Sequence, residues 1–438
     1  MSVKAKMTAG SILSTPARRV ILMGLSILTM GILFSCKRCS MDKSSAEMIE
    51  PHTQSGPDPI PNTLAEPQIR VAVLKEVPEV RLDAPGALSI TGMDGQELSP
   101  KHRTGMGCVI NSIPGGLAIN GVPHPGLRKL RLESTSMLLL ASQELARTVD
   151  LYREPERGGL LTLVAHIPME RYLAGVLAGE VPYRRWGAEA LKAQAIASRS
   201  YALYQMQQHA QDPYHVEASV MSQVFKPASE YPAVLTAAVH ATRGLVLTCD
   251  GRLFSAYFHS TCGGRTAAAV SVFPGQTPLR TLAGVNCPYC TGSPSYRWQA
   301  SLAKDELTRR LRRCPDLNGQ PLDSVQSVLF TSSGASGRDN ARAEQVLITH
   351  SGGRVTLPAN RFRLAIGAGE LKSVLIEAAT ERAEVIEFSG RGFGHGVGLC
   401  QYGSQGMAER GLSCEQILGH YYPGGDLTKF YGDPIGAL

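Results

Sequence analysis

The sequence predicts an α+β fold, with mixed strands and short helices that form a cleft. Residues 70–164 contain short apolar runs separated by turn residues, a pattern typical of strands. Residues 168–207 contain two segments whose apolar side chains recur at helical spacing. The strands and helices that follow do not alternate regularly, and no internal repeat is found. A sheet built from regular strand–helix–strand units is therefore not expected.

Three helices are expected in the first half of the chain. The first has apolar residues at three- and four-residue spacing: Met169, Tyr172, Leu173, Val176 and Leu177. Gly179 and Pro182 end this helix. The second covers residues 188–207 and is rich in alanine, so that neighbouring elements can approach it closely. Residues 233–241 form a third, shorter helix.

The second half of the chain is predicted to mix hairpins with short helices. A hairpin turns at Asp250-Gly251, because this pair favours the tight turn between two strands. The further expected elements are a helix near 304–312, strands within 325–334, 343–358 and 383–390, a helix from about Ser404 and a last helix near 414–420.

The N-terminus indicates export from the cytoplasm. Basic residues precede the apolar run Val20–Phe34, which is short for a transmembrane helix. Residues 1–35 therefore read as a signal peptide, and Leu33-Phe34-Ser35-Cys36 resembles a lipobox with a lipidated Cys36. An uncleaved anchor or ordinary cleavage further on are the alternatives. Residues 36–69, polar and rich in proline, read as a flexible tether to the membrane, and residues 70–430 as the folded domain.

The charge balance argues against nucleic acid as a partner. The chain of 438 residues has 44 basic and 37 acidic residues, and four of the basic ones fall within residues 1–35. The remaining excess is small and forms no basic block suited to a phosphate backbone.

Glu180 is a candidate general acid. It lies where the first helix ends, and the partial negative charge of a helix C-terminus raises the pKa of a carboxyl group. Apolar neighbours would raise it further. A carboxylic acid that stays protonated near neutral pH can protonate a glycosidic oxygen. A solvated glutamate without a chemical role is the alternative.

A second candidate site consists of His259, Cys262, Cys287 and Cys290. A C-x-x-C pair, a third cysteine and a histidine make a tetrahedral set suited to a structural Zn²⁺. A Cys287–Cys290 disulfide or a redox pair are the alternatives. His259 could also hydrogen-bond into the cleft instead of binding metal.

The segment GRGFGHGVGLCQYG, residues 390–403, has glycine at every second position from Gly390 to Gly398. If the segment is extended, one face carries only backbone, on which a polysaccharide could lie. Arg391 and His395 would then occupy the other face. Close packing by another element is the alternative interpretation of these glycines.

Four motifs together resemble the stage II sporulation protein D family (SpoIID/LytB domain). They are PMERYLAGVLAGEVP with EALKAQAIASRSYAL, then YFHSTCGGRT, RGFGHGVGLCQYGSQGMAERG and ILGHYYPG, and the likeness to the family extends over residues 70–430, the catalytic domain. The resemblance implies a lytic transglycosylase, which cleaves the β-1,4 bond between N-acetylmuramic acid and N-acetylglucosamine in peptidoglycan and leaves 1,6-anhydro ends.

The same resemblance assigns roles to residues. The family's essential acid, the glutamate of a GE-x-P segment, matches Glu180, and metal-binding members support the zinc set. Further residues within the motifs are expected to bind the glycan: Arg199, Ser200, Tyr201, Ser260, Arg391, His395, Gln401 and Tyr402. The alternatives are a non-catalytic wall-binding protein that enhances an amidase, in which case a wall amidase is a partner, and a disulfide-stapled adhesion module.

Overall fold

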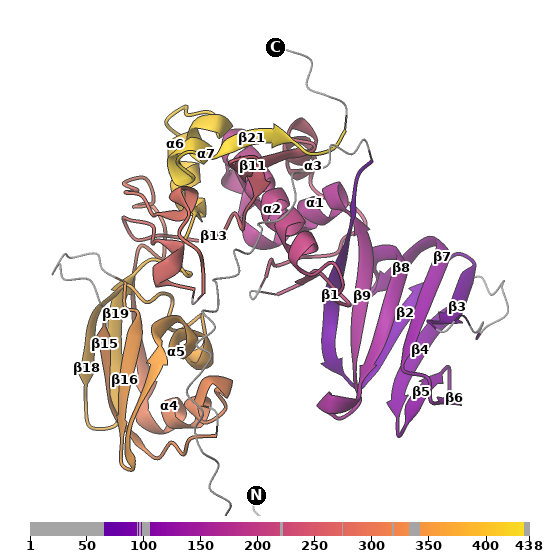
Figure 1. The fold of residues 1–438 in the computed structure, drawn as a ribbon, viewed down its shortest axis with the longest axis horizontal. Coiled ribbons are helices and arrows are strands. Elements are labelled where there is room, and N and C mark those ends of the chain that lie inside the picture. The colour runs from indigo at the N-terminus through magenta and orange to yellow at the C-terminus, as the bar shows by residue number, and fades with distance from the viewer. Residues whose placement is uncertain are drawn as a thin grey trace, which may run out of the picture. The chain divides into compact units, whose positions relative to one another are not determined.

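The computed structural model describes residues 65–432, except 94, 96, 97, 99–105, 220, 221, 274, 318 and 333–341. The described residues belong to one compact unit. They combine helices with several sheets, which confirms the α+β class (Figure 1). The predicted signal peptide, Cys36 and most of the tether lie outside the described residues. Among the described helices, none is long and apolar enough to cross a membrane.

The first part of the chain forms a large, mainly antiparallel sheet with the strand order β10-β1-β9-β8-β7-β2-β4-β5-β6, and β3 pairs with β7. Alternate residues of its strands are buried, as in Glu79–Ala84, so one face of the sheet packs on the core. The strands are β1 Gln68–Val77, β2 Glu79–Ala84, β3 Leu88–Gly92, β4 Met106–Ile113, β5 Gly116–Ile119, β6 Val122–Pro125, β7 Lys129–Leu140, β8 Gln143–Glu154, β9 Leu160–Pro168 and β10 Val216–Glu217.

Helix α2 is the centre of the helical part. It packs against α1, α3, α6, α7 and strand β11, and its small alanine side chains permit contacts on several sides. The predicted helix boundaries agree with the structure to within a few residues. The helices are α1 Met169–Glu180, α2 Ala188–Gln208, α3 Ala233–Ala241, α6 Gln401–Ala408 and α7 Cys414–Tyr421.

Two small sheets accompany these helices. Strands β12, β11 and β21 form an antiparallel sheet, and β13 pairs in parallel with β20. The predicted Asp250-Gly251 turn joins β11 to β12, and both residues have positive φ, as a two-residue hairpin turn requires. The strands are β11 Leu245–Cys249, β12 Arg252–Leu253, β13 Phe258–His259, β20 Leu399–Cys400 and β21 Asp426–Lys429.

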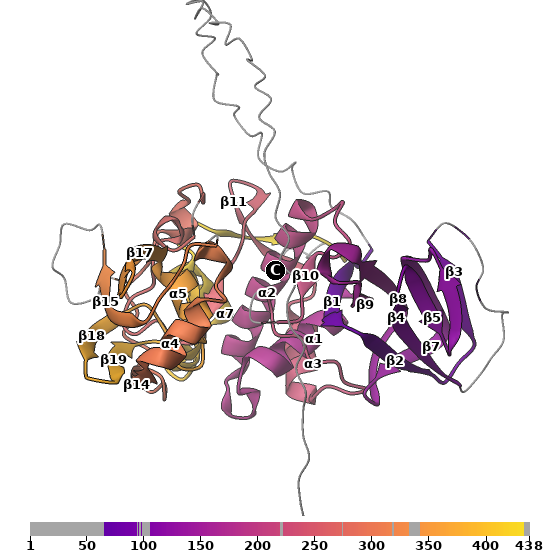
Figure 2. The same cartoon turned by 90° about the horizontal axis from the view of Figure 1, so that it is seen from below.

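The strands and helices of residues 297–391, here called the α4–α5 region, lie together in Figure 2. They have their own hydrophobic core, made mainly of Leu, Ile, Val, Phe and Trp side chains. Two three-stranded antiparallel sheets, β14-β19-β18 and β15-β16-β17, surround this core with helices α4 and α5. The elements are β14 Arg297–Ala303, α4 Lys304–Leu311, β15 Val325–Thr331, β16 Gln345–His350, β17 Gly353–Pro358, α5 Ala359–Ile366, β18 Ile376–Glu381 and β19 Val385–Arg391. Helix α5 is absent from the sequence-based prediction.

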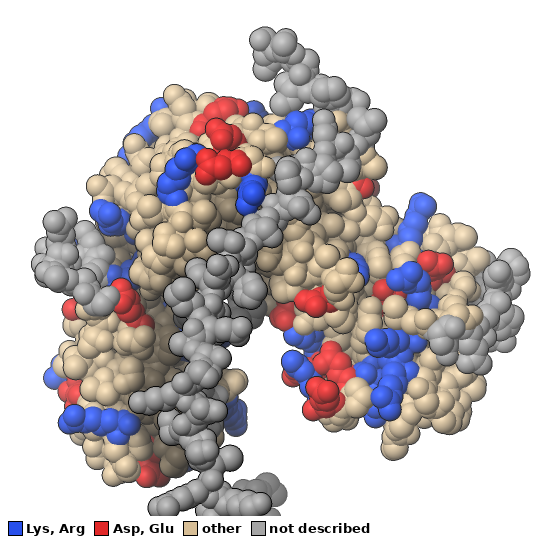
Figure 3. All heavy atoms as spheres, in the orientation of Figure 1, with Lys and Arg blue, Asp and Glu red and all other residues tan. Residues whose placement is uncertain are grey.

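Short 3₁₀ helices complete the fold at Pro155–Arg157, Tyr183–Arg185, Ala269–Ser271, Arg280–Leu282 and Pro315–Leu317. On the face shown in Figure 3, the described Lys and Arg side chains are interspersed with Asp and Glu side chains.

Candidate functional site

Glu180 lies at the C-terminal end of α1, and its carboxyl group is largely buried. The Val224 N–H donates a hydrogen bond of 2.6 Å to Oε1 of Glu180. Burial raises the pKa of this carboxyl group above its ordinary value, while the Val224 N–H and the nearby Gln401 amide oppose the shift. No ion pair to Glu180 occurs among the described residues. The group is therefore biased toward its protonated form by desolvation.

Gln401 begins helix α6 and is buried beside Glu180. The Nε2 atom of Gln401 is buried and makes no hydrogen bond of standard geometry. The amide still stabilises the Glu180 carboxylate, because it lies close to it. An unsatisfied buried amide is unusual in a folded protein and is more frequent where a ligand completes the site. The structure thus places an amide donor next to the candidate acid.

A large cavity of about 670 Å³ is here called the Trp186 cavity. The first of its lining residues along the chain is Pro182, two residues after Glu180. Trp186 and Tyr402 meet edge to face with ring centroids 5.7 Å apart, and Arg410 lies over the Tyr289 ring. The other lining residues come mainly from the loop after Cys290 and from α6: Pro182, Arg185, Thr291, Gly292, Ser293, Pro294, Gln405, Gly406 and Glu409. Aromatic rings with polar groups between them suit the apolar faces and hydroxyl groups of a sugar.

A second, smaller cavity of about 150 Å³, here called the His395 cavity, has Tyr201 and Ser222 in its wall. Both residues are close to Glu180 in the fold. Tyr201 interacts electrostatically with Glu180. Ser222 is two residues before Val224, whose N–H donates to Glu180. The remaining lining residues are Tyr257, Phe258, Phe273, Asn360, Arg363, Leu364 and His395.

The two histidines predicted for the site are buried and neutral. His395 donates from Nε2 to the Phe258 carbonyl and accepts the Val397 N–H at Nδ1. Burial, together with the charge of Arg363, lowers the pKa of His395 to about 3. His259 donates from Nδ1 to the Val397 carbonyl, and burial lowers its pKa well below the ordinary value. Neither imidazole is protonated near neutral pH, so neither can act as an acid.

The structure brings Cys262, Cys287 and Cys290 together, with Cys400 as the fourth member. Their sulfur atoms all lie within 4.8 Å of one another, and all four residues are buried. The thiols of Cys262 and Cys290 are 3.5 Å apart, and no described cysteine forms a disulfide. The Cys262 and Gly403 N–H groups donate to the Cys400 sulfur, which is how protein backbones support thiolate ligands.

His259 does not belong to this set, which corrects the predicted ligand list. Its ring packs against His395 with centroids 5.5 Å apart, and Nδ1 is engaged by the Val397 carbonyl. The parallel pairing of β13 with β20 places Cys400 opposite His259. Four sulfur atoms within 4.8 Å of one another match the Cys₄ ligand set of a tetrahedral Zn²⁺ ion.

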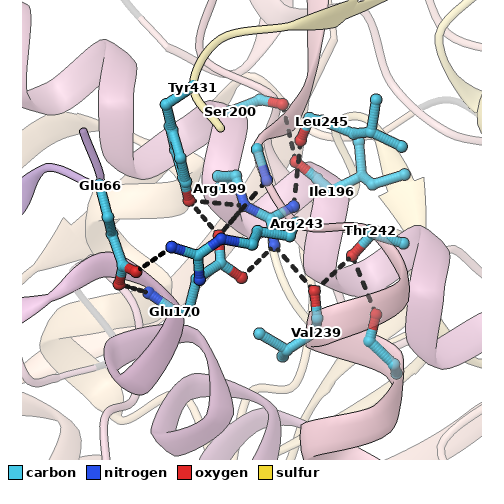
Figure 4. A network of polar contacts seen from close by, with 12 residues as sticks. Glu66, Glu170, Ile196, Arg199, Ser200, Val239, Thr242, Arg243, Leu245 and Tyr431 are labelled. Atoms are coloured by element: carbon cyan, nitrogen blue, oxygen red, sulfur yellow. Dashed lines mark hydrogen bonds and ion pairs between the residues drawn. The ribbon is translucent and has the colours of Figure 1, made fainter. Parts of the chain in front are cut away.

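Arg199 and Ser200 are buried structural residues and do not face either cavity, contrary to the sequence-based expectation. Figure 4 shows Arg199 within a polar network, where its guanidinium binds both carboxylate oxygens of Glu170 at 3.0 and 2.7 Å. The Leu245 carbonyl and the Tyr431 hydroxyl also accept from it. Ser200 donates to the Ile196 carbonyl and accepts the Leu247 N–H.

Arg391 and Ser260 also lie outside the lining of the two cavities. The Arg391 guanidinium forms an ion pair of 2.8 Å with Glu377, which joins the end of β19 to β18. Ser260 accepts the Tyr402 N–H at its carbonyl and so positions the start of α6. Of the predicted glycan-binding residues, Tyr201 and His395 line the His395 cavity, Tyr402 lines the Trp186 cavity, and Gln401 lies beside Glu180.

The glycine-rich segment is not an extended strand with a bare face. Strand β19 ends at Arg391, and Gly392, Gly394, Gly396 and Gly398 all have positive φ. A Cβ atom on Gly394 would lie 2.8 Å from Cβ of His259, and one on Gly398 would collide with the Tyr257 carbonyl. The packing interpretation is therefore correct, because backbone conformation and close neighbours both require glycine.

Several site residues were not predicted. Cys400 was visible in the sequence, but no local spacing connects it with Cys262, which lies 138 residues earlier. Trp186 and Tyr289 follow Glu180 and Cys287 closely, and their aromatic character was the available signal. Arg363 and Asn360 lie on the unpredicted helix α5.

Comparisons with known proteins point to one family. Residues 157–249 match the profile of the SpoIID family, described as stage II sporulation protein, and residues 280–398 match a domain of unknown function (DUF8618). The chain is 31% identical to stage II sporulation protein D of Bacillus subtilis over 61% of this chain and 76% of that protein. It is 30% identical to an uncharacterised protein of Brachyspira hyodysenteriae, over 62% and 69% of the two chains. It is also 27% identical to the amidase enhancer of Bacillus subtilis, over 59% of this chain and 40% of that protein.

Proposed function

Because the chain belongs to the SpoIID/LytB family, we propose that it is a lytic transglycosylase that cleaves the glycan strands of peptidoglycan. The bond cleaved is the β-1,4 linkage between N-acetylmuramic acid and N-acetylglucosamine, and the product has a 1,6-anhydro end. The observation that carries this proposal is the largely buried, unpaired carboxyl group of Glu180, whose pKa is raised by burial.

Glu180 serves first as acid and then as base. Its proton passes to the bridging oxygen as the bond from that oxygen to C1 of the muramic acid breaks. The 6-hydroxyl of the same sugar then attacks C1, and its proton returns to Glu180. The Val224 N–H holds Oε1, so Oε2 is the oxygen that carries the proton. One carboxyl group is sufficient, in contrast to the pair that hydrolytic glycosidases use.

The cavities give this acid its substrate-binding surroundings. In the Trp186 cavity, Trp186, Tyr289 and Tyr402 offer aromatic faces for sugar rings. The unsatisfied Gln401 amide is positioned to donate to a sugar oxygen near Glu180. Neutral His395 donates to the Phe258 carbonyl and so holds strand β13, and it does not transfer protons.

The four-cysteine set is proposed to hold a structural Zn²⁺ ion. The residues fit the ion, since four buried sulfur atoms lie within 4.8 Å of one another and the Cys400 sulfur accepts two backbone N–H bonds. With all four positions filled by protein, the ion would supply cross-linking and no reactive water. The ligands Cys287 and Cys290 would fix the loop that forms one wall of the Trp186 cavity.

The N-terminal segment supports a location in the cell envelope, where peptidoglycan is found. We propose export by residues 1–35 and attachment to the membrane through Cys36. A second function is favoured by the similarity to an amidase enhancer: a wall-binding protein without glycan cleavage that acts with a wall amidase. The two proposals share the fold and differ in the role of Glu180.

Digestion of purified peptidoglycan distinguishes the two functions. The wild-type chain is expected to release products with 1,6-anhydro ends, detected by mass spectrometry, from sacculi with or without stem peptides. Glu180→Gln should slow their release by about 100- to 10 000-fold, because the proton donor is removed. Glu230→Gln, which neutralises an exposed carboxylate elsewhere, should not change the rate. Full activity of Glu180→Gln would refute the acid, and glycan binding without product would favour the amidase enhancer.

Metal analysis tests the four-cysteine set. The purified chain should contain about one zinc ion per molecule, and Cys400→Ser should lower the content and affinity. His259→Ala should keep the metal, whereas the earlier ligand set predicts its loss. Cys108→Ser changes a buried cysteine of strand β4 and is the matched control. Absence of zinc together with a Cys287–Cys290 disulfide would refute the metal site.

A further inference from the structure

The His395 cavity contains a buried positive charge that has no acidic partner among the residues that the structure describes. Arg363 of helix α5 is only 5% exposed and lines the cavity. Its Nε donates to the Lys372 carbonyl at 3.0 Å, and Nη1 lies 3.4 Å from Oδ1 of Asn360. No carboxylate forms an ion pair with Arg363 among the described residues.

The surroundings of Arg363 make its positive charge unfavourable, so that an anion bound beside it would be stabilising. Burial lowers its pKa to about 10, with a further contribution from the nearby Arg342, so the guanidinium stays charged at neutral pH. His395, in the same wall, is neutral. A buried, unpaired cation is costly, and an anionic ligand would offset that cost.

We propose that the His395 cavity binds a carboxylate group of the glycan substrate through Arg363. A planar guanidinium is matched to a carboxylate, and Asn360 offers an amide beside it. The cavity of about 150 Å³ has room for such a group, and Tyr201, Tyr257 and Phe273 would cover its apolar part. This inference rests on the proposed function for its choice of substrate.

Two parts of peptidoglycan could supply the carboxylate. The lactyl ether of N-acetylmuramic acid ends in a carboxylate when no peptide is attached, and stem peptides carry carboxylates of their own. In both cases the anion would be bound close to Glu180, because Ser222 lines the cavity and Val224 binds the acid. A charge contact at this place would fix the position of the muramic acid ring relative to the proton donor.

The proposal gives the α4–α5 region a role in recognition. Both Arg363 and Asn360 belong to residues 280–398, which match a domain of unknown function. The acid, in contrast, belongs to the segment that matches the SpoIID profile. Chemistry and substrate selection would thus come from separate segments of the chain.

Binding is measured by calorimetry with the full chain carrying Glu180→Gln, to prevent turnover. The first ligand is a glycan oligomer with free lactyl carboxylates, the second is the same oligomer with these groups converted to methyl amides, and the third carries stem peptides. The free-carboxylate oligomer should bind about 10- to 100-fold more tightly than the amide if the lactyl group is the source. Preference for the peptide-bearing oligomer would identify the stem peptide as the source.

Adding Arg363→Met should abolish the preference for the charged ligand and leave binding of the neutral amide unchanged. Arg361→Met removes a mostly exposed charge from the same helix and should keep the preference. Arg363→Lys, which retains the charge but loses the planar fork, should give intermediate discrimination if Arg363→Met does not fold. Equal binding of all three oligomers by the starting protein overturns the inference, without the need for any Arg363 variant.

Cleavage is recorded separately with the otherwise unchanged chain. Cleavage without charge discrimination would leave the proposed reaction standing and refute the carboxylate subsite. Charge discrimination without cleavage would support the subsite and refute the lytic reaction.

Discussion

The two ends of helix α1 hold glutamates in opposite environments. Glu170, in the first turn, shares its carboxylate with Arg199 through two hydrogen bonds and also accepts from the Tyr431 hydroxyl. Glu180, in the last turn, has one backbone donor and no ion-pair partner among the described residues. The same helix thus carries a paired carboxylate at Glu170 and, at Glu180, a carboxylate without an ion-pair partner among the described residues.

The difference separates structural from chemical roles. A buried ion pair in which every polar atom has a hydrogen-bond partner fixes how the surrounding elements pack. Its carboxylate also stays deprotonated, because the cation stabilises the charged form. A desolvated carboxyl without a cation can gain and lose a proton near the pH of the cell. The family resemblance assigned roles to both Glu180 and Arg199, but the ion pair with Glu170 shows that Arg199 supports the fold, whereas Glu180 has no ion-pair partner among the described residues.

The largest expected effect is at the paired end. Arg199→Met should lower the free energy of unfolding by about 3–5 kcal/mol, because Glu170 would be left as an uncompensated buried charge. Adding Glu170→Gln should recover part of this loss, since the orphaned charge is then removed. Urea denaturation of the single and double variants measures the coupling. A stable Arg199→Met protein with weakened glycan binding would instead restore Arg199 as a substrate-binding residue.

The elements around α1 could be predicted because their signals are local. Helical spacing, Gly179 and Pro182 define α1, and the alanine-rich segment defines α2, so the position of Glu180 at a helix end followed from the sequence. The raised pKa of Glu180 was also predicted, but its main physical cause is burial by distant segments such as residues 222–224. The pairing of Glu170 with Arg199 has no local sequence signature.

The parts that were not predicted depend on contacts between distant residues. The parallel pairing of β13 with β20 brings Cys400 close to Cys262. The sequence does not indicate this pairing, because the whole α4–α5 region lies between the two strands in the chain. Helix α5 was not predicted, because it begins directly after strand β17 and its residues were assigned to the same strand segment. Alternating glycines have the same spacing in a bare strand and in a looped segment, and only positive φ distinguishes the two.

The glycine segment provides the second-largest expected effect. Gly394→Val should lower the free energy of unfolding by roughly 2–4 kcal/mol, because its φ of 105° is strained for valine and its Cβ would press against His259. Gly369→Val, at an exposed glycine with nothing within 4 Å, is the control. Thermal melts of both variants test this expectation. A stable Gly394→Val protein that fails to bind glycan would show that the segment lines the groove.

The smallest effect is a pH-dependent change in stability at the isolated end of α1. Glu180 has a raised pKa when folded, so its contribution to stability is fully present below the unfolded pKa and is lost as pH rises through the folded pKa. Glu180→Gln removes this loss, and the variant should gain stability relative to wild type as the pH rises.

Glu189 offers a matched control of opposite sign. The Lys192 ammonium and the Cys414 N–H hold the pKa of Glu189 below its ordinary value, so its stabilising contribution exists above the unfolded pKa and disappears as the pH falls through the folded pKa. Glu189→Gln should therefore lose stability relative to wild type at neutral pH, where Glu180→Gln gains it. Urea midpoints between about pH 4 and about pH 8 compare the two variants. If Glu180→Gln loses stability at neutral pH as Glu189→Gln does, its carboxylate has a favourable partner in the folded protein, and the two ends of α1 do not differ in the way that the proposed acid requires.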